Sequence, residues 1–485
     1  MGARRTGRGG LVVLLVAIVV VGVVATSVTV ARADPPPAEK PVRVVHWPAD
    51  IAPIADRVEQ IRGLRFRHAI PVRHVQVPNG SATPVDASTR AALETAVKPL
   101  VALGMVGASN NVASLFDAAS EPPAGVYTSD NEVIRVFVPT ATASGRAVLA
   151  HELTHALEDQ RFPQADRRTP RIATQVIAYR AVVEGSASRV QRLYVDEPWE
   201  PPFPAQRVVH PGEIQFGTDT SVQEWEWFAA LGVAPYTLGT AYVDATLARG
   251  DVTWDRIIAD PPISDVVIVD PLAPPGSLFQ ARGLPSTTFS EPSAIEVYLV
   301  LASRIDPADA LDAMLRSSGS LLTTYERDGR PCADLTLLTR RPDDPSVTAT
   351  LDKWIASAGP ANASRGSVST GTRIVEPSRT PSGAPFVFTV QPGSPILTSC
   401  RGVAAVPFGS FFVPLALLVG RNEAAARAMR HGFDETATAC IADAVLTDRR
   451  FRDHLRGDLE SRSTLAANVP RRVYRRAVAG CDTAP

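Results

Sequence analysis

Residues Ser144–Gln160 read SGRAVLAHELTHALEDQ and contain the pentapeptide His151-Glu152-Leu153-Thr154-His155, of the form HExxH. The stretch has no proline, and its aliphatic residues recur at helical spacing: Leu149, Leu153, Ala156 and Leu157. This pattern predicts an amphipathic helix with Ser144 as its N-cap. Positions i and i+4 of a helix lie one above the other, so His151 and His155 can both point at one metal ion.

The histidine pair predicts zinc chemistry. Two neutral imidazoles suit Zn²⁺, which takes nitrogen ligands in tetrahedral geometry. Glu152 directly follows the first histidine, where its carboxylate can serve as general base for a zinc-activated water. We therefore predict one zinc ion per chain and hydrolysis of a peptide or protein substrate. The alternative is an ordinary amphipathic helix whose two histidines are solvated or packed in the core.

A third ligand must come from a later element of the chain. Asp159 lies about 12 Å along the helix axis from the first histidine, too far for one zinc ion to bind both. Residues Gln175–Val195 predict a second helix, in which Glu184 is the only carboxylate. A lone acid among apolar neighbours is costly to bury unless a partner such as zinc compensates its charge. Gly185 beside it would permit close helix approach; the alternative for Glu184 is a solvated surface carboxylate.

These segments resemble the gluzincins, the metallopeptidases that combine HExxH with a glutamate ligand. HELTHALEDQ followed by AVVEGSA is similar, more narrowly, to the secreted or envelope-anchored zincins of actinobacteria, related to the MA-type peptidases. Further similar stretches extend the resemblance over residues 44–271: VEQIRGLRFRHAIPV, AGVYTSDNEVIRVFV and PYTLGTAYVDATLARGDVTWDRIIADPPISD. The resemblance implies zinc ligation by His151, His155 and Glu184, with Glu152 as the general base.

The resemblance leaves three parts of the site open. Thermolysin-like members carry a histidine-orienting aspartate four residues after the glutamate ligand; here that position is Ser188, so Asp159 or a backbone carbonyl would have to substitute. Gluzincins commonly stabilise the oxyanion with a Tyr or His beyond the third ligand. That implies Tyr236 first and His210 second, although a tyrosine beside proline can also be a core aromatic. In zincins the last strand before the metal helix is often the substrate-binding edge, which here implies Val133–Val138.

The first 33 residues indicate export. Arginines precede the apolar run Leu11–Ala25, and Ala31-Arg32-Ala33 forms an A-x-A cleavage pattern. Residues 1–33 therefore predict either a cleaved signal peptide or an uncleaved membrane anchor, because the apolar region is long enough to span a bilayer of roughly 30 Å. Both alternatives place everything after Asp34 outside the cytoplasm, either secreted or attached to the membrane by this segment alone.

The four cysteines agree with export: Cys332, Cys400, Cys440 and Cys481. An even count without CxxC spacing in an exported chain predicts two disulfides rather than a metal cluster. Three pairings are open to four cysteines. We favour Cys332–Cys400 with Cys440–Cys481, because each then closes a loop within one local segment. The alternative is buried free thiols.

The chain divides into four predicted parts. Residues 1–33 are the signal or anchor and 34–41 a Pro-rich stalk, followed by a metallopeptidase domain at 42–283 and a C-terminal α+β region at 284–485. The predicted fold class is α+β, zincin-like in the first domain and disulfide-bearing in the C-terminal region. A net charge of −1 argues against a nucleic-acid partner.

Several other segments carry specific structural predictions. Gly125–Val138 predicts a hairpin, and Pro198–Pro211 a loop or lid. Val266–Val269 predicts a buried strand, and the Ala/Ser/Gly-rich Ala356–Ser369 a mobile loop. Leu415–Leu446 predicts a largely helical stretch. The C-terminal region has no recognisable catalytic constellation, so we expect it to act as scaffold or in substrate selection.

Together these observations predict an exported zinc peptidase, in which Glu152 takes a proton from a zinc-activated water and passes it to the leaving nitrogen. A second class of function stays open: an envelope binding or structural protein that keeps the zincin fold without turnover. Ser188 and the lack of an assured oxyanion donor favour that alternative. Glu152 argues against it, because a purely structural zinc has no use for this carboxylate.

Overall fold

The structure of the 485-residue chain is a computed structural model that describes these residues: 46–75, 94, 97–107, 124–163, 173–196, 213–215, 222–274, 276–279, 289–359, 362–368, 373–376, 386–389, 392–461, 464–466 and 469–481. Helices and strands both occur along this part of the chain, which confirms the predicted α+β class. The predicted export segment, the predicted stalk, the predicted lid and His210 lie outside the described residues. Among the described helices, none is long and apolar enough to cross a membrane.

The HExxH segment forms helix α5, Ala143–Arg161. Its N-cap is Thr142, whose hydroxyl accepts a hydrogen bond from the backbone N–H of Gly145, so the prediction of Ser144 is wrong by two residues. Both side chains carry a suitable hydroxyl, but it is Thr142 that adopts the extended backbone of an N-cap, with φ −86° and ψ 157°. The predicted aliphatic stripe of α5 is fully buried.

A small core surrounds α5. Helix α2 packs on it beside a three-stranded sheet, in the order β1, β3, β2. The bounds are α2 Ala52–Arg62, β1 Val72–His74, β3 Val133–Val136 and β2 Gly125–Thr128. Strands β2 and β3 pair antiparallel, so the predicted hairpin is confirmed, whereas β1 pairs parallel to β3. Aliphatic side chains of these elements form one buried cluster with α5.

The prediction of Val133–Val138 as the substrate-binding edge is wrong. Strand β3 is the middle strand, bonded to β1 on one side and to β2 on the other, so its backbone has no room for another strand. The sequence pattern missed this because β1 comes from a segment about sixty residues earlier in the chain. The edge next to α5 is β2, where the Phe137 N–H donates to the Ala124 carbonyl. In an antiparallel pair, residues that hydrogen-bond to the partner strand alternate with residues that do not. The backbone groups of Gly125 and Tyr127 therefore point away from β3.

The predicted second metal helix is α6, Ala173–Asp196, and it crosses α7, Val222–Arg249, at two glycines. A Cβ atom on Gly185 would lie 2.2 Å from the carbonyl carbon of Gly239. One on Gly239 would lie 1.9 Å from the carbonyl oxygen of Ala181. Any side chain would force the helices apart, so the prediction that Gly185 permits close approach is confirmed.

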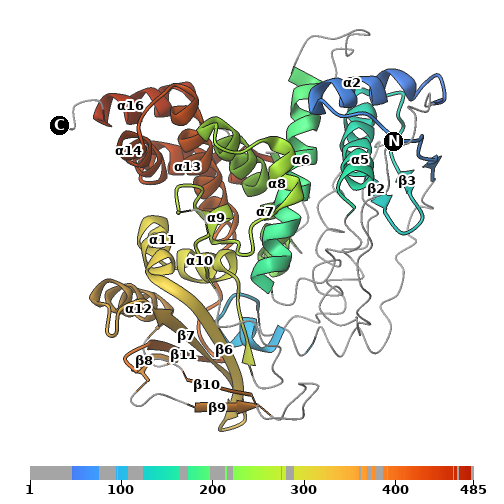
Figure 1. Cartoon of the computed structure of the whole chain (residues 1–485). Helices are drawn as coiled ribbons and strands as arrows, with labels where there is room; N and C mark the ends of the chain where they lie inside the picture. The colour runs from blue at the N-terminus through green and yellow to red at the C-terminus, as the bar shows by residue number, and fades with distance from the viewer. Residues whose placement is uncertain are drawn as a thin grey trace, which may run out of the picture.

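The larger sheet has the strand order β5, β6, β7, β11, β8, with bounds Phe289–Ser290, Ser317–Arg327, Arg330–Thr339, Pro395–Cys400 and Ala363–Ser367. Three helices lie beside it (Figure 1): α10 Ala294–Ala302, α11 Pro307–Arg316 and α12 Pro345–Ala358. A separate pair is formed by β9 Arg373–Glu376 and β10 Phe386–Thr389. The mobile loop predicted for Ala356–Ser369 is wrong, because that segment contains the end of α12 and strand β8. Backbone pairing with β11 holds β8 in place although none of its residues is β-branched or aromatic.

Four helices close the chain: α13 Phe412–Arg430, α14 Glu435–Leu446, α15 Arg449–Ser461 and α16 Arg471–Cys481. The stretch predicted as largely helical is two helices, because Gly432 takes φ 80° and Asp434 caps α14. Helix α13 packs on α7, and one large buried cluster joins α6, α7 and α10 to the closing helices (Figure 1). Residues on both sides of position 283 therefore share one core.

Two short helices and one strand pair complete the description: α8 Trp254–Ala259, α9 Val266–Val269, and β4 Glu213–Gln215 with β12 Thr464–Ala466. The strand predicted at Val266–Val269 is wrong, because α9 is a single helical turn. The Asp265 carbonyl accepts hydrogen bonds from the N–H groups of Ile268 and Val269. Four consecutive buried apolar residues fit a helix or a strand equally well, so their pattern could not decide.

Both disulfides form as predicted, Cys332–Cys400 and Cys440–Cys481. The first joins directly opposed positions of β7 and β11. The second joins α14 to α16. All four cysteines lie after residue 330, so α5 and α6 are held by packing and polar contacts alone.

Candidate metal centre

Helices α5 and α6 bring three metal-ligating side chains to one point. The Nε2 atoms of His151 and His155 lie 3.0 Å apart. The Glu184 carboxylate oxygen Oε2 lies 3.2 Å from the first of them and 3.4 Å from the second. The three groups could hold a metal ion, so the structure places together the residues that the sequence singled out.

The spacing of these atoms fits a small tetrahedral cation. Ligand atoms about 2.0–2.1 Å from a tetrahedral zinc ion lie roughly 3.3 Å from one another, close to the three separations observed. The side chains of His151, His155 and Glu184 are only 9%, 12% and 17% exposed. Two imidazole nitrogens and a carboxylate this close together and this buried need a positive charge between them. A divalent cation can supply that charge.

The pKa values of Glu184 and His155 are shifted in opposite directions by their interaction. Burial raises the pKa of Glu184, but the charge of His155 and the hydrogen bonds of both histidines outweigh it and hold that pKa well below its ordinary value. Burial lowers the pKa of His155, yet the charge and hydrogen bond of Glu184 raise it to about 9. These opposite shifts show that Glu184 and His155 interact strongly at short range.

Glu152 lies between this triad and strand β2. Its Oε2 atom accepts a hydrogen bond of 2.7 Å from the backbone N–H of Tyr127. Gly125 makes room for it, because a Cβ atom there would lie 2.9 Å from the Glu152 Cγ atom. Burial raises the pKa of Glu152, and the charges of His151 and His155 oppose that rise. The hydrogen bond from the Tyr127 N–H thus fixes the Glu152 carboxylate beside the triad through Oε2. The Oε1 atom takes no part in that hydrogen bond.

Tyr236, the first candidate for oxyanion stabilisation, lies in the site. It comes from α7, and its ring stacks on the His151 ring with centroids 5.9 Å apart and an interplanar angle of 23°. Burial raises the pKa of Tyr236 well above its ordinary value, and the charge and hydrogen bond of Glu184 raise it further. Its hydroxyl is therefore a neutral hydrogen-bond donor next to the third ligand. The second candidate, His210, lies outside the described residues.

The contacts expected to orient the ligand histidines differ from the thermolysin-like pattern. The Nδ1 atom of His151 and the Oγ atom of Ser188 are both buried, and within the described chain neither has a hydrogen-bond partner. Asp159, one predicted substitute, accepts a hydrogen bond from the Tyr127 hydroxyl at 2.8 Å. Neither Asp159 nor a backbone carbonyl therefore orients His151 through Nδ1.

A buried polar network that the sequence did not reveal ties α5 to α6 next to the triad. Glu158 accepts hydrogen bonds from Arg62 Nε at 2.7 Å and from Ser186 Oγ at 2.5 Å. Trp254 donates to the same Ser186 hydroxyl at 2.8 Å. Glu158 lies one turn after His155, so this acid shares the face of α5 that carries the ligands. The position of Glu158 on that face could have been read from the sequence. Its partner Arg62 could not, because it lies 96 residues away in the chain.

A second unpredicted residue brings a positive charge to the site. Arg180 precedes Glu184 by one turn of α6, and its charge lowers the pKa of Tyr236 against the larger effect of burial. The residue is half-buried. An arginine here can interact with negative charge that develops near the tyrosine hydroxyl.

Comparison with protein-family models, curated proteins and solved structures gave no match to this chain.

The geometry of the site is therefore the basis on which a function can be proposed. The triad can bind a metal, Glu152 can accept a proton beside it, and Tyr236 can donate a hydrogen bond. These are the three chemical roles that hydrolysis of a carbonyl compound needs.

Proposed function

We propose that this chain is an exported zinc-dependent peptidase of the gluzincin type. The observation that carries the proposal is the convergence of His151, His155 and Glu184 within hydrogen-bonding distance of one another, with Glu152 directly beside them. A structural zinc site is usually closed by four protein ligands. Three protein ligands leave one position for water or substrate, which is the arrangement of catalytic zinc sites.

The chain's own residues would divide the chemistry as follows. Zinc, when bound by the triad, would polarise the peptide carbonyl and acidify a water molecule. Glu152 would take the proton from that water and return it to the leaving nitrogen. The Tyr236 hydroxyl would donate a hydrogen bond to the developing oxyanion, and the Arg180 charge would favour the same state.

Strand β2 is the edge on which we would place the substrate. Its outward-facing backbone groups are the N–H and C=O of Gly125 and the C=O of Tyr127, since the Tyr127 N–H is bonded to Glu152. An extended peptide can add to such an edge through main-chain hydrogen bonds. The Tyr127–Glu152 bond would then fix the distance between the bound peptide and the base.

One observation favours the alternative of a zincin-fold binding protein without turnover. In the described chain His151 Nδ1 has no hydrogen-bond partner, and such partners typically contribute about 10–100-fold to metal affinity or activity. A weakened ligand histidine would lower activity. It would not explain why a carboxylate is held beside the triad, so we favour the enzyme.

The test is Glu152→Gln in the purified exported protein, assayed on a peptide library together with zinc content. Gln keeps the shape and the acceptor for the Tyr127 N–H but cannot hold a proton, so cleavage should fall by orders of magnitude while zinc is retained. Glu326→Gln, at an exposed position on β6, is the matched control and should cleave like the parent. Parent protein that binds zinc but cleaves no peptide would support the binding protein. Undiminished cleavage by Glu152→Gln would overturn the assigned base.

A further inference from the structure

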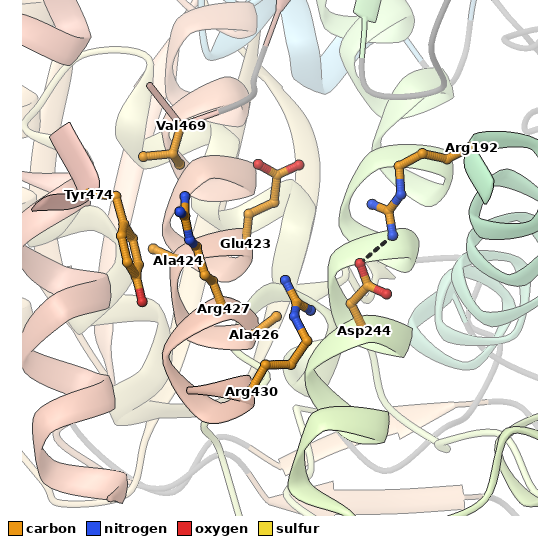
Figure 2. Close-up of a pocket in the computed structure, with 9 residues that line it drawn as sticks. All are labelled: Arg192, Asp244, Glu423, Ala424, Ala426, Arg427, Arg430, Val469 and Tyr474. Carbon is orange, nitrogen blue, oxygen red and sulfur yellow. Dashed lines mark hydrogen bonds and ion pairs between the residues drawn. The ribbon is translucent and has the colours of Figure 1, made fainter. Parts of the chain in front are cut away.

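A cavity of about 200 Å³ lies between α6 and α7 on one side and α13 and α16 on the other, apart from the triad. Its lining, shown in Figure 2, includes Arg192, Asp244, Glu423, Arg427, Arg430 and Tyr474. Arg192 follows Glu184 by eight residues on α6, which places it about 12 Å further along that helix. The cavity is therefore a separate feature from the metal centre.

On the side of α6 and α7, two arginines share one acid. Arg189 Nε lies 2.7 Å from one carboxylate oxygen of Asp244, and Arg192 lies 2.6 Å from the other. Burial and the charges of Arg192 and Arg430 lower the pKa of Arg189, and Asp244 opposes this. One carboxylate thus balances two guanidiniums here, and a third is close enough to affect them.

On the opposite side, helix α13 contributes Arg427 and Arg430, one turn apart. Arg427 lies over the Tyr474 ring, 4.2 Å from its centroid. In the part of the chain that the structure describes, neither arginine forms an ion pair with an acid. Figure 2 shows Arg430 projecting from α13 toward Asp244 and Arg192, and Arg427 lying along α13 beside Tyr474.

The cavity consequently carries excess positive charge. Four guanidiniums approach it, including Arg189 just behind the wall, against the two carboxylates of Asp244 and Glu423. Burial raises the pKa of Glu423 to about 7, so near neutral pH this acid is only partly ionised. Like charges brought together by helix packing repel one another unless a counter-charge is present.

We propose that this cavity binds a small oxyanion, a phosphate or a carboxylate group, through Arg427, Arg430 and Arg192. Guanidinium groups present paired N–H donors that match the oxygen geometry of both groups. The bound anion would link α13 to α6 and α7, and so would stabilise the packing of the closing helices on the helix that carries Glu184. This site is independent of peptide hydrolysis and needs no metal.

The experiment measures thermal unfolding of the full chain with increasing inorganic phosphate at constant ionic strength, and in parallel with acetate. We expect a saturable rise in Tm with at least one of the two anions, since a ligand that binds only the folded state stabilises it by mass action. Saturation with phosphate alone assigns a phosphate site, and saturation with acetate alone a carboxylate site. A Tm that rises without saturation, or does not change, with both anions overturns the proposal.

Two variants locate the effect. Arg430→Gln changes an exposed residue and should fold normally, and Arg427→Gln removes the guanidinium over Tyr474. Each should weaken the apparent affinity at least about tenfold, because charge-assisted hydrogen bonds are lost. Arg475→Gln, exposed on α16 and outside the cavity lining, is the control and should respond like the parent. An unchanged affinity in both cavity variants would show that the anion binds elsewhere and would overturn the site.

Discussion

At the scale of single residues, Tyr236 is the side chain whose role the structure defines most narrowly. Its ring stacks on one candidate ligand, His151, and its hydroxyl interacts with another, Glu184, which raises the pKa of that hydroxyl. A stacked core aromatic would need only the ring. The hydroxyl, held neutral by burial beside the triad, is the part that chemistry could use.

Tyr236→Phe separates these two roles because it keeps the ring and removes the donor. If the hydroxyl stabilises the oxyanion, kcat should fall about 10²-fold while KM and zinc content change little. Peptide hydrolysis kinetics and metal analysis on the same sample measure both quantities. A variant with normal kcat but reduced zinc would assign Tyr236 to orienting Glu184 instead.

The residues of the triad could be predicted because each belongs to a recognisable local sequence pattern. The i, i+4 spacing identified His151 and His155, and isolation among apolar neighbours identified Glu184. The contacts that surround the triad have no such local pattern. Glu158 meets Arg62 only after the chain has folded, and the unpartnered Nδ1 atom of His151 depends on side-chain packing.

At the scale of elements, the position of Glu184 depends on how closely α6 and α7 pack. The crossing occurs at Gly185, directly after the third ligand, against Gly239. Tyr236 lies one turn before Gly239 on α7. The same contact therefore sets the positions of both Glu184 and Tyr236 relative to α5.

Gly239→Ala should separate these helices. The added Cβ would lie 1.9 Å from the Ala181 carbonyl oxygen, a backbone atom that cannot rotate away. We expect a loss of roughly 3 kcal/mol in the free energy of unfolding and weaker zinc binding, because Glu184 moves with α6. Gly480→Ala is the control, since nothing lies within 4 Å of a Cβ there in α16. Denaturant unfolding and zinc titration of both variants provide the comparison, and equal stability and affinity would contradict the proposed importance of the crossing.

Elements with a clear helical period or a turn signal could be predicted from sequence, as α5, α6 and the β2–β3 hairpin illustrate. Short apolar segments could not. Val266–Val269 is buried as a helical turn rather than a strand, and residues 363–367 form a strand without strand-forming side chains. In both cases partners distant in sequence determined the outcome, which is why local pattern was insufficient.

At the scale of the whole molecule, two cores meet at α6. Its middle belongs to the large cluster shared with α7 and α13, and Val190 and Tyr194 belong to the small cluster around α5. The metal centre lies where these two parts meet. Glu226 of α7 strengthens the large core by accepting hydrogen bonds from the N–H groups of Gly409, Phe411 and Phe412 at the start of α13.

This buried cap predicts a pH dependence of stability. Burial raises the pKa of Glu226 from 4.5 to about 7, against the effect of its three backbone hydrogen bonds. Below pH 4.5 the group is protonated in both states. Between pH 4.5 and 7 the unfolded chain releases the proton and the folded chain keeps it, so stability should fall as pH rises, and the deficit then stays constant above pH 7.

The expected loss across that window is on the order of 3 kcal/mol, and Glu226→Gln should remove this contribution. Chemical denaturation gives the free energy of unfolding of parent and variant at each pH between 4.5 and 7. The difference between the two pH dependences is the contribution of Glu226, because the other titrating groups are the same in both proteins. Identical slopes would show that Glu226 ionises as readily in the folded chain as in the unfolded one.

The large-scale arrangement could be predicted only in part. The favoured cysteine pairing is correct because both disulfides are local, one between neighbouring strands and one between packed helices. The packing of α13 on α7 brings together segments nearly two hundred residues apart. The hydrophobic pattern of each helix shows that one face is buried, but it does not indicate which helix packs against that face.

The most direct test of the central claim is the zinc content of the purified full-length protein, measured by elemental mass spectrometry alongside His151→Ala, His155→Ala and Glu184→Ala. The account predicts about one zinc ion per chain in the parent, none in the histidine variants and a severe reduction in Glu184→Ala. Glu158→Ala would be a poor control because it breaks a buried ion pair, so exposed Glu326→Ala serves instead and should bind like the parent. A parent without zinc, or full zinc occupancy in the histidine variants, would contradict the account.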